Sequence, residues 1–183
     1  LEFLEAHPAV SVRILFIDRP INLLEEGVDV AIRIGHLADS GFSAIRIGSV
    51  RRVVAASPAY LARHGEPQTP ADLKDHRVVA STSAWASPEW RFAGDQRLTI
   101  RAALQCNTNT AAIDPALAGF GLTRVLAYQI GPSIAEDALR IVLAEYEEEP
   151  LPIHVIHPEG RSAPAKTRAF IDLAVARLRD DPH

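Results

Sequence analysis

The stretch that decides the fold runs from residue 21 to residue 65 and reads INLLEEGVDVAIRIGHLADSGFSAIRIGSVRRVVAASPAYLARHG. Residues 28–35 (VDVAIRIG) are mainly apolar and end at a glycine, as expected of a strand covered on both faces. Residues 22–26 predict a short helix that ends at Gly27 in a left-handed conformation. With a further apolar strand at 12–17, this order predicts a parallel strand–helix–strand unit and hence an α/β fold.

The second half of this stretch predicts a long extended segment followed by a helix. Residues 43–57 contain one break, at Gly48, and are long enough to leave one lobe and enter another. Ser57 suits the N-cap of the following helix, Pro58 its first position and Gly65 its end. Proline first and glycine last is the usual order of these residue types in a helix.

Strands and helices continue to alternate along the rest of the chain. The pattern predicts helices at 70–75, 126–130 and 164–179, and strands at 78–82, 90–92, 97–106, 122–125 and 153–156. An alanine-rich helix follows Thr110, and because it contains Pro115 we expect the helix proper to start at Asp114. The acidic run at 145–149 is expected to be a solvated turn.

A second extended segment, at 139–143, would return the chain to the first lobe. The two crossings predict a discontinuous lobe one (1–52 with 150–183) and an inserted lobe two (53–149). We therefore expect two Rossmann-like lobes joined by two crossover strands. Such a hinged pair places a cleft at the carboxyl ends of its strands.

Composition narrows the class of protein. The 183 residues carry a net charge of −4, and lysine occurs only at 74 and 166, so this chain alone is not expected to bind DNA. No apolar run is long enough to span a bilayer, and the first residues show no charged-then-apolar leader pattern, so we expect no signal for secretion. A single cysteine, Cys106, excludes an intrachain disulfide and fits a cytoplasmic location. Because the chain contains no methionine, we expect it to be a fragment.

Three stretches resemble the effector-binding domain of LysR-type transcriptional regulators. They are GVDVAIRIG (27–35) continuing to SPAYLARHG (57–65), TPADLKDHR (69–77), and LAGFGLTRVLAYQI (117–130) with LPIHVIHPEG (151–160) and KTRAFIDLAVARL (166–178). The resemblance implies a type 2 periplasmic-binding-protein fold that senses a small molecule. It also implies a homodimer or tetramer formed through these domains, with residues 1–17 contributing. The family's winged helix–turn–helix, through which DNA is bound, and the first strand of its effector domain lie outside this chain.

A polar run lies between a predicted strand and the following helix. Its residues, Asn107, Thr108, Asn109 and Thr110, would face the positive end of the helix, which suits an anionic effector. Ordinary helix capping explains the same residues equally well. Ser81 and Thr82 end a neighbouring strand and would offer hydroxyl groups to the same cleft, although strand-end residues of this type are common.

Two arginines interrupt apolar strands. A buried arginine needs a partner, which for Arg33 and Arg124 is either an effector carboxylate or an internal aspartate or glutamate. Ile34, Gly35 and His36 would line the rim of lobe one by position. The effector-binding candidates are thus Arg33, Ile34, Gly35, His36, Ser81, Thr82, Asn107, Thr108, Asn109, Thr110 and Arg124.

Motifs for catalysis or metal binding are not found. His154 and His157 lie three apart on a predicted strand, hence on opposite faces, and Cys106 is expected to be a small buried residue. No nucleophile elbow, P-loop or dinucleotide-binding glycine motif occurs. We therefore expect no catalytic residue, no metal site and no cofactor.

The preferred interpretation is the regulatory domain of a transcription factor, which senses a small, anionic metabolite in the interlobe cleft. Binding would shift an equilibrium between arrangements and pass the signal to a DNA-binding domain. A solute-binding protein of a membrane transporter shares the fold and stays an alternative, as does an enzyme on a similar scaffold. An upstream helix–turn–helix would favour the regulator, a leader peptide the receptor, and turnover of the bound metabolite the enzyme.

Overall fold

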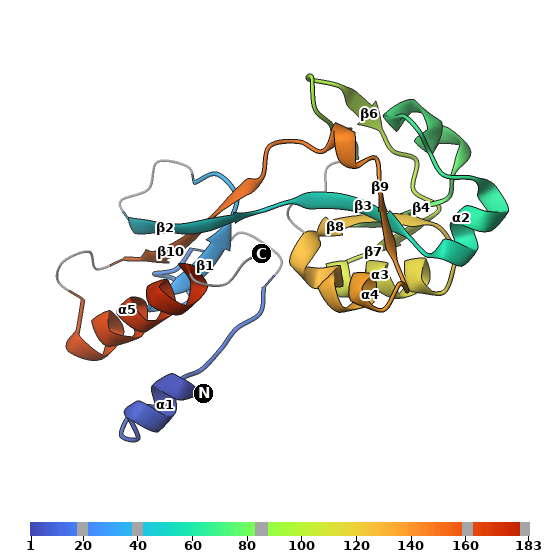
Figure 1. The fold of residues 1–183 in the computed structure, drawn as a ribbon. Helices are drawn as coiled ribbons and strands as arrows, with labels where there is room; N and C mark the ends of the chain where they lie inside the picture. The colour runs from blue at the N-terminus through green and yellow to red at the C-terminus, as the bar shows by residue number, and fades with distance from the viewer. Residues whose placement is uncertain (18–21, 38–41, 83–87, 159–162, 180–183) are drawn as a thin grey trace. The chain divides into compact units, whose positions relative to one another are not determined.

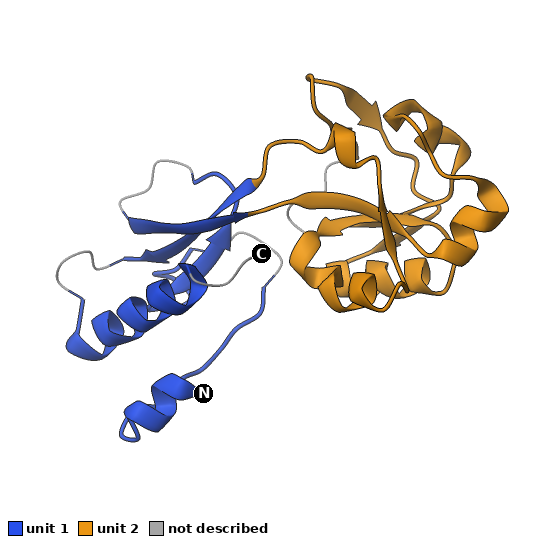
Figure 2. Cartoon of the chain, in the orientation of Figure 1, with its two compact units in different colours: residues 1–49, 151–183 blue, residues 50–150 orange. Residues whose placement is uncertain are grey.

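The computed structural model describes residues 1–17, 22–37, 42–82, 88–158 and 163–179. The chain divides into two compact units, each with its own sheet and helices (Figures 1 and 2). Unit 1 comprises Leu1–Ser49 and Leu151–His183, and unit 2 comprises Val50–Pro150. Unit 2 is therefore a continuous insert in a discontinuous unit 1.

Unit 1 is built on a three-stranded sheet. Its elements are α1 (Glu2–Ala6), β1 (Ala31–Ile34), β2 (Ser43–Val50), β10 (Leu151–His157) and α5 (Ala165–Arg179). β10 lies in the middle, in the order β1-β10-β2, and pairs with β1 in antiparallel register. α5 packs against β10 (Figure 1). Because β10 is the central strand and has a run of apolar residues, it is the most thoroughly buried strand of this sheet.

The parallel pairing predicted for the start of unit 1 is wrong. Residues 12–17 are not part of a strand, and the side chain of Phe16 is 94% exposed. β1 begins only at Ala31, and the strand beside it is the antiparallel β10. An apolar segment becomes a strand only where a neighbour offers backbone hydrogen-bond partners, and local pattern does not reveal that neighbour.

The short helix predicted before β1 is a single turn. Glu26 N–H donates to Asn22 O at 3.1 Å, and the chain then turns at Gly27, whose φ of +63° is the expected left-handed value. A single hydrogen-bonded turn is too short for a stable helix, because the hydrogen bonds gained by propagation do not yet offset the free-energy cost of nucleation. The left-handed conformation predicted for Gly27 is therefore confirmed, whereas the helix predicted at 22–26 is wrong.

Unit 2 is built on a five-stranded mixed sheet. Its strands are β3 (Arg52–Ala56), β4 (Val78–Ser81), β7 (Leu104–Cys106), β8 (Leu122–Leu126) and β9 (Arg140–Val142), in the order β7-β4-β8-β3-β9. β4 is parallel to β7 and β8, whereas β3 is antiparallel to β8 and β9. A separate hairpin pairs β5 (Glu89–Arg91) with β6 (Arg97–Thr99), as predicted.

Helices cover both faces of this sheet. They are α2 (Pro58–His64), α3 (Asn109–Leu117), α4 (Gly131–Ala135), and the 3-10 turns η1 (Pro70–Asp75), η2 (Ala127–Ile130) and η3 (Ala144–Tyr146). Alternate β3 residues enter two apolar clusters, Val54 on the side of Tyr60 and Leu73, and Val53 on the side of Ile113. Coverage on both faces explains the continuous apolar run of β3.

The start of α2 matches its prediction. Ser57 Oγ accepts from the Tyr60 N–H at 3.3 Å, Pro58 occupies the first helical position, and Gly65 ends the helix with φ +83°. Here every local signal agrees with the tertiary structure.

The helix around Pro115 differs from its prediction, because it starts at Asn109 and not at Asp114. Proline lacks the N–H that would bond the carbonyl four residues earlier, which is that of Ala111. The Cys106 thiol donates to this Ala111 carbonyl, with Sγ and O 3.2 Å apart. A contact from outside the helix therefore compensates for the proline.

The second crossing is shorter than predicted. Only Arg140–Val142 forms a strand, and Leu143 adopts a left-handed φ of +57°. The acidic run is not a solvated turn, because η3 occupies its start and Glu147 and Glu148 form ion pairs. These two carboxylates are 13% and 20% exposed.

Candidate functional site

The carboxyl ends of β4 and β7 bring two predicted groups of polar residues together in unit 2. Ser81 is paired with Cys106, and Thr82 continues the pairing beyond the strand. Thr82 N–H donates to Cys106 O at 2.5 Å, and Thr82 Oγ1 donates to the same oxygen at 3.1 Å. Because Asn107 follows Cys106 directly, the hydroxyl-bearing end of β4 lies beside the polar run 107–110.

The polar run also begins α3, so the capping interpretation applies to part of it. Thr108 Oγ1 accepts from the Ala111 N–H at 3.2 Å, which is N-capping. Asn109 Nδ2 donates to Gln129 Oε1 at 3.2 Å and so joins α3 to η2. Asn107 and Thr110 are exposed. A helix start with exposed amide and hydroxyl groups, at the carboxyl edge of parallel strands, can bind an anionic or polar ligand.

The predicted residues of unit 1 lie at the end of β1. Arg33 and Ile34 are its last two residues, and Gly35 N–H extends the pairing by donating to Pro152 O at 2.8 Å. Gly35 has φ +109°, a conformation open to glycine, and it directs the chain to the exposed His36.

Two further side chains of unit 1, those of Arg46 and His154, were missed. Arg33 is directly opposite His154 on β10, so both side chains project from the same face of the sheet. Burial, together with the positive charges of Arg46 and His36, lowers the pKa of His154. Arg46 and His154 were not predicted because the strand order β1-β10-β2 joins distant parts of the chain. The one available signal was a histidine inside an apolar strand.

Arg124 makes its contacts at a different place in unit 2. Its side chain is 6% exposed, and its guanidinium forms an ion pair with Glu148 and donates to Arg91 O at 3.0 Å. It also lies over the rings of Trp90 and Phe92, 5.4 and 5.6 Å from their centroids. Burial, followed by the charge of Arg52, lowers the pKa of Arg124 to about 10. The internal carboxylate partner considered for Arg124 is therefore Glu148.

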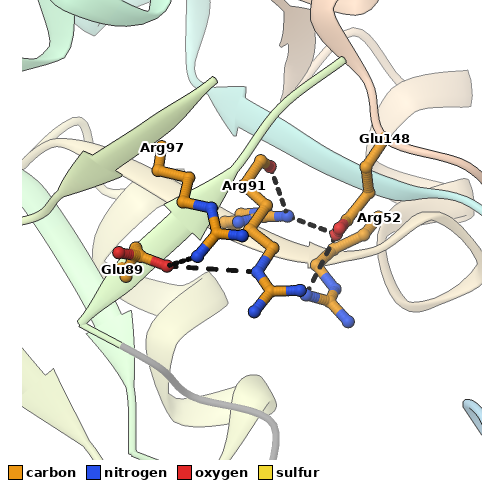
Figure 3. A network of polar contacts seen from close by, with 6 residues as sticks. Arg52, Glu89, Arg91, Arg97 and Glu148 are labelled. Atoms are coloured by element: carbon orange, nitrogen blue, oxygen red, sulfur yellow. Dashed lines mark hydrogen bonds and ion pairs between the residues drawn. The ribbon is translucent and has the colours of Figure 1, made fainter. Parts of the chain in front are cut away.

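Around Glu148 the structure contains a polar network that sequence reasoning missed (Figure 3). Arg52 is paired with Glu148 at 3.0 Å, and on the neighbouring hairpin Arg97 and Arg91 lie 3.4 and 4.0 Å from Glu89. A small pocket opens here, lined by Arg52, Val54, Arg91, Phe92, Arg124, Leu143, Glu147 and Glu148. These residues come from four separate parts of unit 2, which explains why no local motif indicates the pocket.

The part of the chain that the structure describes was searched for side chains that could bind a metal ion together. Within it, no group of three or more histidine, cysteine, aspartate or glutamate side chains could hold a metal ion.

Comparison with known proteins gives the same family along nearly the whole chain. A model of the LysR substrate binding domain matches residues 1–179. An HTH-type transcriptional regulator of Haemophilus influenzae is 35% identical over 90% of this chain and 58% of its own length. The regulator YhjC of Escherichia coli is 30% identical over 98% of this chain and 62% of its own length. The chain thus spans about three fifths of these relatives.

Solved structures agree in fold. The regulatory domain of CrgA, a LysR-type transcriptional regulator from Neisseria meningitidis, is 28% identical, with a TM-score of 0.85 over 97% of this chain and 88% of that one. The regulatory domain of AphB from Vibrio vulnificus matches at 24% identity, with a TM-score of 0.79 over 96% of this chain and 88% of that one. These matches confirm the two-lobed, periplasmic-binding-protein-like α/β fold and favour a regulator over a transporter receptor. The chain belongs to the LysR substrate-binding-domain family of transcriptional regulators.

Proposed function

We propose that this chain senses a small anionic metabolite and that the carboxyl edge of β4 and β7 is its main contact. The observation that carries the proposal is the grouping of Ser81, Thr82 and the polar run 107–110 at one sheet edge beside the start of α3. Backbone N–H groups and hydroxyls at a helix start favour negative charge. In unit 1, the guanidinium of Arg33 and the exposed imidazole of His36, at the end of β1, offer hydrogen-bond donors of their own for an anion.

The two units supply the domain organisation of the proposal. We propose that units 1 and 2 correspond to the two regulatory subdomains, which the sequence predicts at 1–52 with 150–183 and at 53–149. A two-lobed sensor responds to its ligand only as far as the ligand prefers one arrangement of the lobes.

A screen of small organic acids by thermal shift tests the sensing function. A ligand that binds only the folded state adds about 2.7 kcal/mol to the free energy of unfolding when its concentration is 100 times its Kd. Tm rises as a result. For a hit, Asn107→Ala and Thr110→Ala are expected to weaken binding, because both side chains are exposed at the site. Gln105→Ala is the matched control, since Gln105 is exposed on β7 but precedes its carboxyl end. Equal affinity in all three variants would contradict this placement of the ligand.

The remaining steps of the function concern the whole protein. The relatives are named as HTH-type regulators and are longer than this chain. We propose that DNA is bound by an N-terminal winged helix–turn–helix and that these domains assemble as a dimer or tetramer. Sedimentation of this chain as a monomer at high micromolar concentration would contradict the assembly.

The location and the absence of catalysis follow from the same proposal. A DNA-binding regulator works in the compartment that holds the DNA, so we propose the cytoplasm. Separately, no helix within the described ranges has the length and apolar character needed to cross a membrane. We propose that the metabolite is bound and released unchanged. Recovery of a modified metabolite after incubation would contradict a purely regulatory role.

A further inference from the structure

The side chain of Gln129 fixes the orientation of the Asn109 amide at the start of α3. The Leu126 N–H donates to Gln129 Oε1 at 3.0 Å, and Asn109 Nδ2 donates to the same oxygen at 3.2 Å. A backbone N–H can only donate, so the Gln129 atom that faces Leu126 is the amide oxygen. That oxygen can only accept, so the Asn109 atom that faces it is the amide nitrogen. The orientation of both amides therefore follows from one backbone donor.

The Asn109 amide consequently presents its oxygen to a ligand. Its nitrogen is turned toward Gln129, so Oδ1 lies on the other side of the amide group, away from η2. Asn109 is partly exposed as the first residue of α3, and among the described residues none donates a hydrogen bond to Oδ1. An amide oxygen carries two lone pairs, so this atom is available to a hydrogen-bond donor of the ligand.

Thr82 adds a second acceptor at the same edge of the sheet. Its hydroxyl donates to Cys106 O at 3.1 Å, and because a hydroxyl has a single hydrogen, Oγ1 can only accept from a ligand. Thr82 is exposed, and it bonds the residue that directly precedes the polar run 107–110. Two oxygen acceptors thus belong to this edge, and neither can form a hydrogen bond with the oxygens of a ligand carboxylate.

Donors for a carboxylate are present beside these acceptors. Thr108 Oγ1 accepts from the Ala111 N–H, so its own hydrogen can be donated to a ligand, and the first N–H groups of α3 have no partner within the helix. An ammonium group on the ligand would be disfavoured by the positive end of the helix, whereas a hydroxyl would not. We propose that the effector is a hydroxy acid whose hydroxyl donates to Asn109 Oδ1, and that Gln129 sets this preference. The inference rests on the proposed function of the polar run.

Pairs of acids that differ only in this group test the preference by isothermal titration calorimetry. The pairs are lactate with pyruvate, malate with oxaloacetate, and mandelate with phenylglyoxylate, so that a ketone oxygen replaces the hydroxyl in each. In at least one pair the hydroxy acid should bind about tenfold more tightly, because the ketone would set one acceptor against another and leave Asn109 Oδ1 without a partner. Equal affinities within every pair that binds, or tighter binding of the oxo acids, would overturn the proposal.

Variants of Gln129 test its role as the positioning residue. Gln129→Leu removes the acceptor, so the Asn109 amide can turn over and offer its nitrogen to a ketone, and the preference for the hydroxy acid should disappear. Gln129→Glu is the matched control: it keeps an acceptor oxygen for Asn109 and should keep the preference, even where its charge weakens both acids. A merely structural role would weaken both acids equally in Q129L and leave their ratio unchanged, which would overturn the role of Gln129. Asn109→Ala leaves the bond between Leu126 and Gln129 in place, should also abolish the preference, and keeps the test decisive if Q129L fails to fold.

Failure of this inference can be told apart from failure of the proposed function. Acids without a hydroxyl that bind equally well, and that Asn107→Ala weakens, would keep the polar run as the site and overturn only the preference. Hydroxy acids whose affinity is unchanged in N107A and N109A would place the effector elsewhere and overturn both. Binding of no acid from the three pairs would end the present inference, whereas the wider screen of organic acids decides the proposed function.

Discussion

Gly121 allows the sharpest test of how β4 and β8 are held together. A Cβ atom at this position would lie 2.4 Å from Arg77 O and 3.0 Å from Arg77 C, both backbone atoms that cannot turn aside. The next residue, Leu122, donates its N–H to the same Arg77 O at 2.9 Å. Gly121→Ala must therefore push the starts of the two strands apart and weaken this hydrogen bond.

The size of the effect follows from that geometry. Ordinary contact begins at 3.4 Å, so the strands must separate by 3.4 − 2.4 = 1.0 Å. Overpacking typically costs about 1–3 kcal/mol and a lost hydrogen bond about 1 kcal/mol. We expect the free energy of unfolding of unit 2 to fall by about 2–4 kcal/mol.

Urea unfolding followed by tryptophan fluorescence measures this change, because both tryptophans of the chain, at 85 and 90, lie in unit 2. With a slope of about 2 kcal/mol/M, the midpoint should fall by about 1–2 M. Gly131→Ala is the control, since Gly131 has helical φ and ψ and a Cβ there meets nothing within 4 Å, so it should stabilise the protein by about 0.4–1 kcal/mol. A G121A variant within about 1 kcal/mol of the wild type would refute the packing argument.

Three other outcomes can be measured in the same way. Tyr60→Phe removes the buried hydroxyl that accepts from the Arg77 N–H at 2.9 Å and bonds His76 Nδ1 at 3.2 Å, and should cost about 2–3 kcal/mol by urea unfolding; a loss below about 0.5 kcal/mol would contradict it. Burial, and then the charge of a neighbouring histidine, lowers the pKa of His76 in the folded protein. As pH falls, this histidine is therefore protonated in the unfolded chain before it is protonated in the folded one, and stability is lost below about pH 6.5. The stability difference between wild type and His76→Gln should therefore shift against the wild type between about pH 7.5 and 5, and a constant difference would argue otherwise. Cys106→Ala deprives the Ala111 carbonyl of its donor and should cost about 1 kcal/mol, whereas Cys106→Ser should retain stability; equal losses would show that the thiol is not needed as a donor.

Elements with complete local signals could be predicted from the sequence. α2 has a capping serine, a first-position proline and a terminal glycine, and its bounds were predicted correctly. The hairpin strands around Gly94 were likewise indicated by their turn. In these segments the hydrogen bonds that define the structure join residues close in sequence, so a single window contains the evidence.

Features that depend on distant partners could not be predicted. The helix start at Asn109 requires the Cys106 thiol to satisfy a carbonyl, which a rule about proline alone does not include. The acidic run was interpreted as solvated, but Glu148 is paired with Arg52 of β3 and Arg124 of β8, which are distant in sequence. Charged residues take their role from partners that the strand order brings close, and that order is a tertiary property.

The candidate site shows the same division. Thr108 and its neighbours could be found because a polar run before a helix is a local pattern, although the pattern cannot separate capping from ligand binding. Arg46 and His154 lie on strands that are distant in sequence from Arg33, and only the order of the sheet relates them.

The two ends of unit 2 meet. Its first strand, β3, pairs with its last strand, β9, and Arg51 and Arg52 pair with Glu147 and Glu148 just before the chain leaves the unit. Residues 50–150 therefore form a unit whose first and last strands are paired and whose apolar clusters lie within it. Such a miniature protein is small enough for complete NMR assignment, so that shifts induced by titrated carboxylates would map atom by atom without contributions from the remainder of the polypeptide.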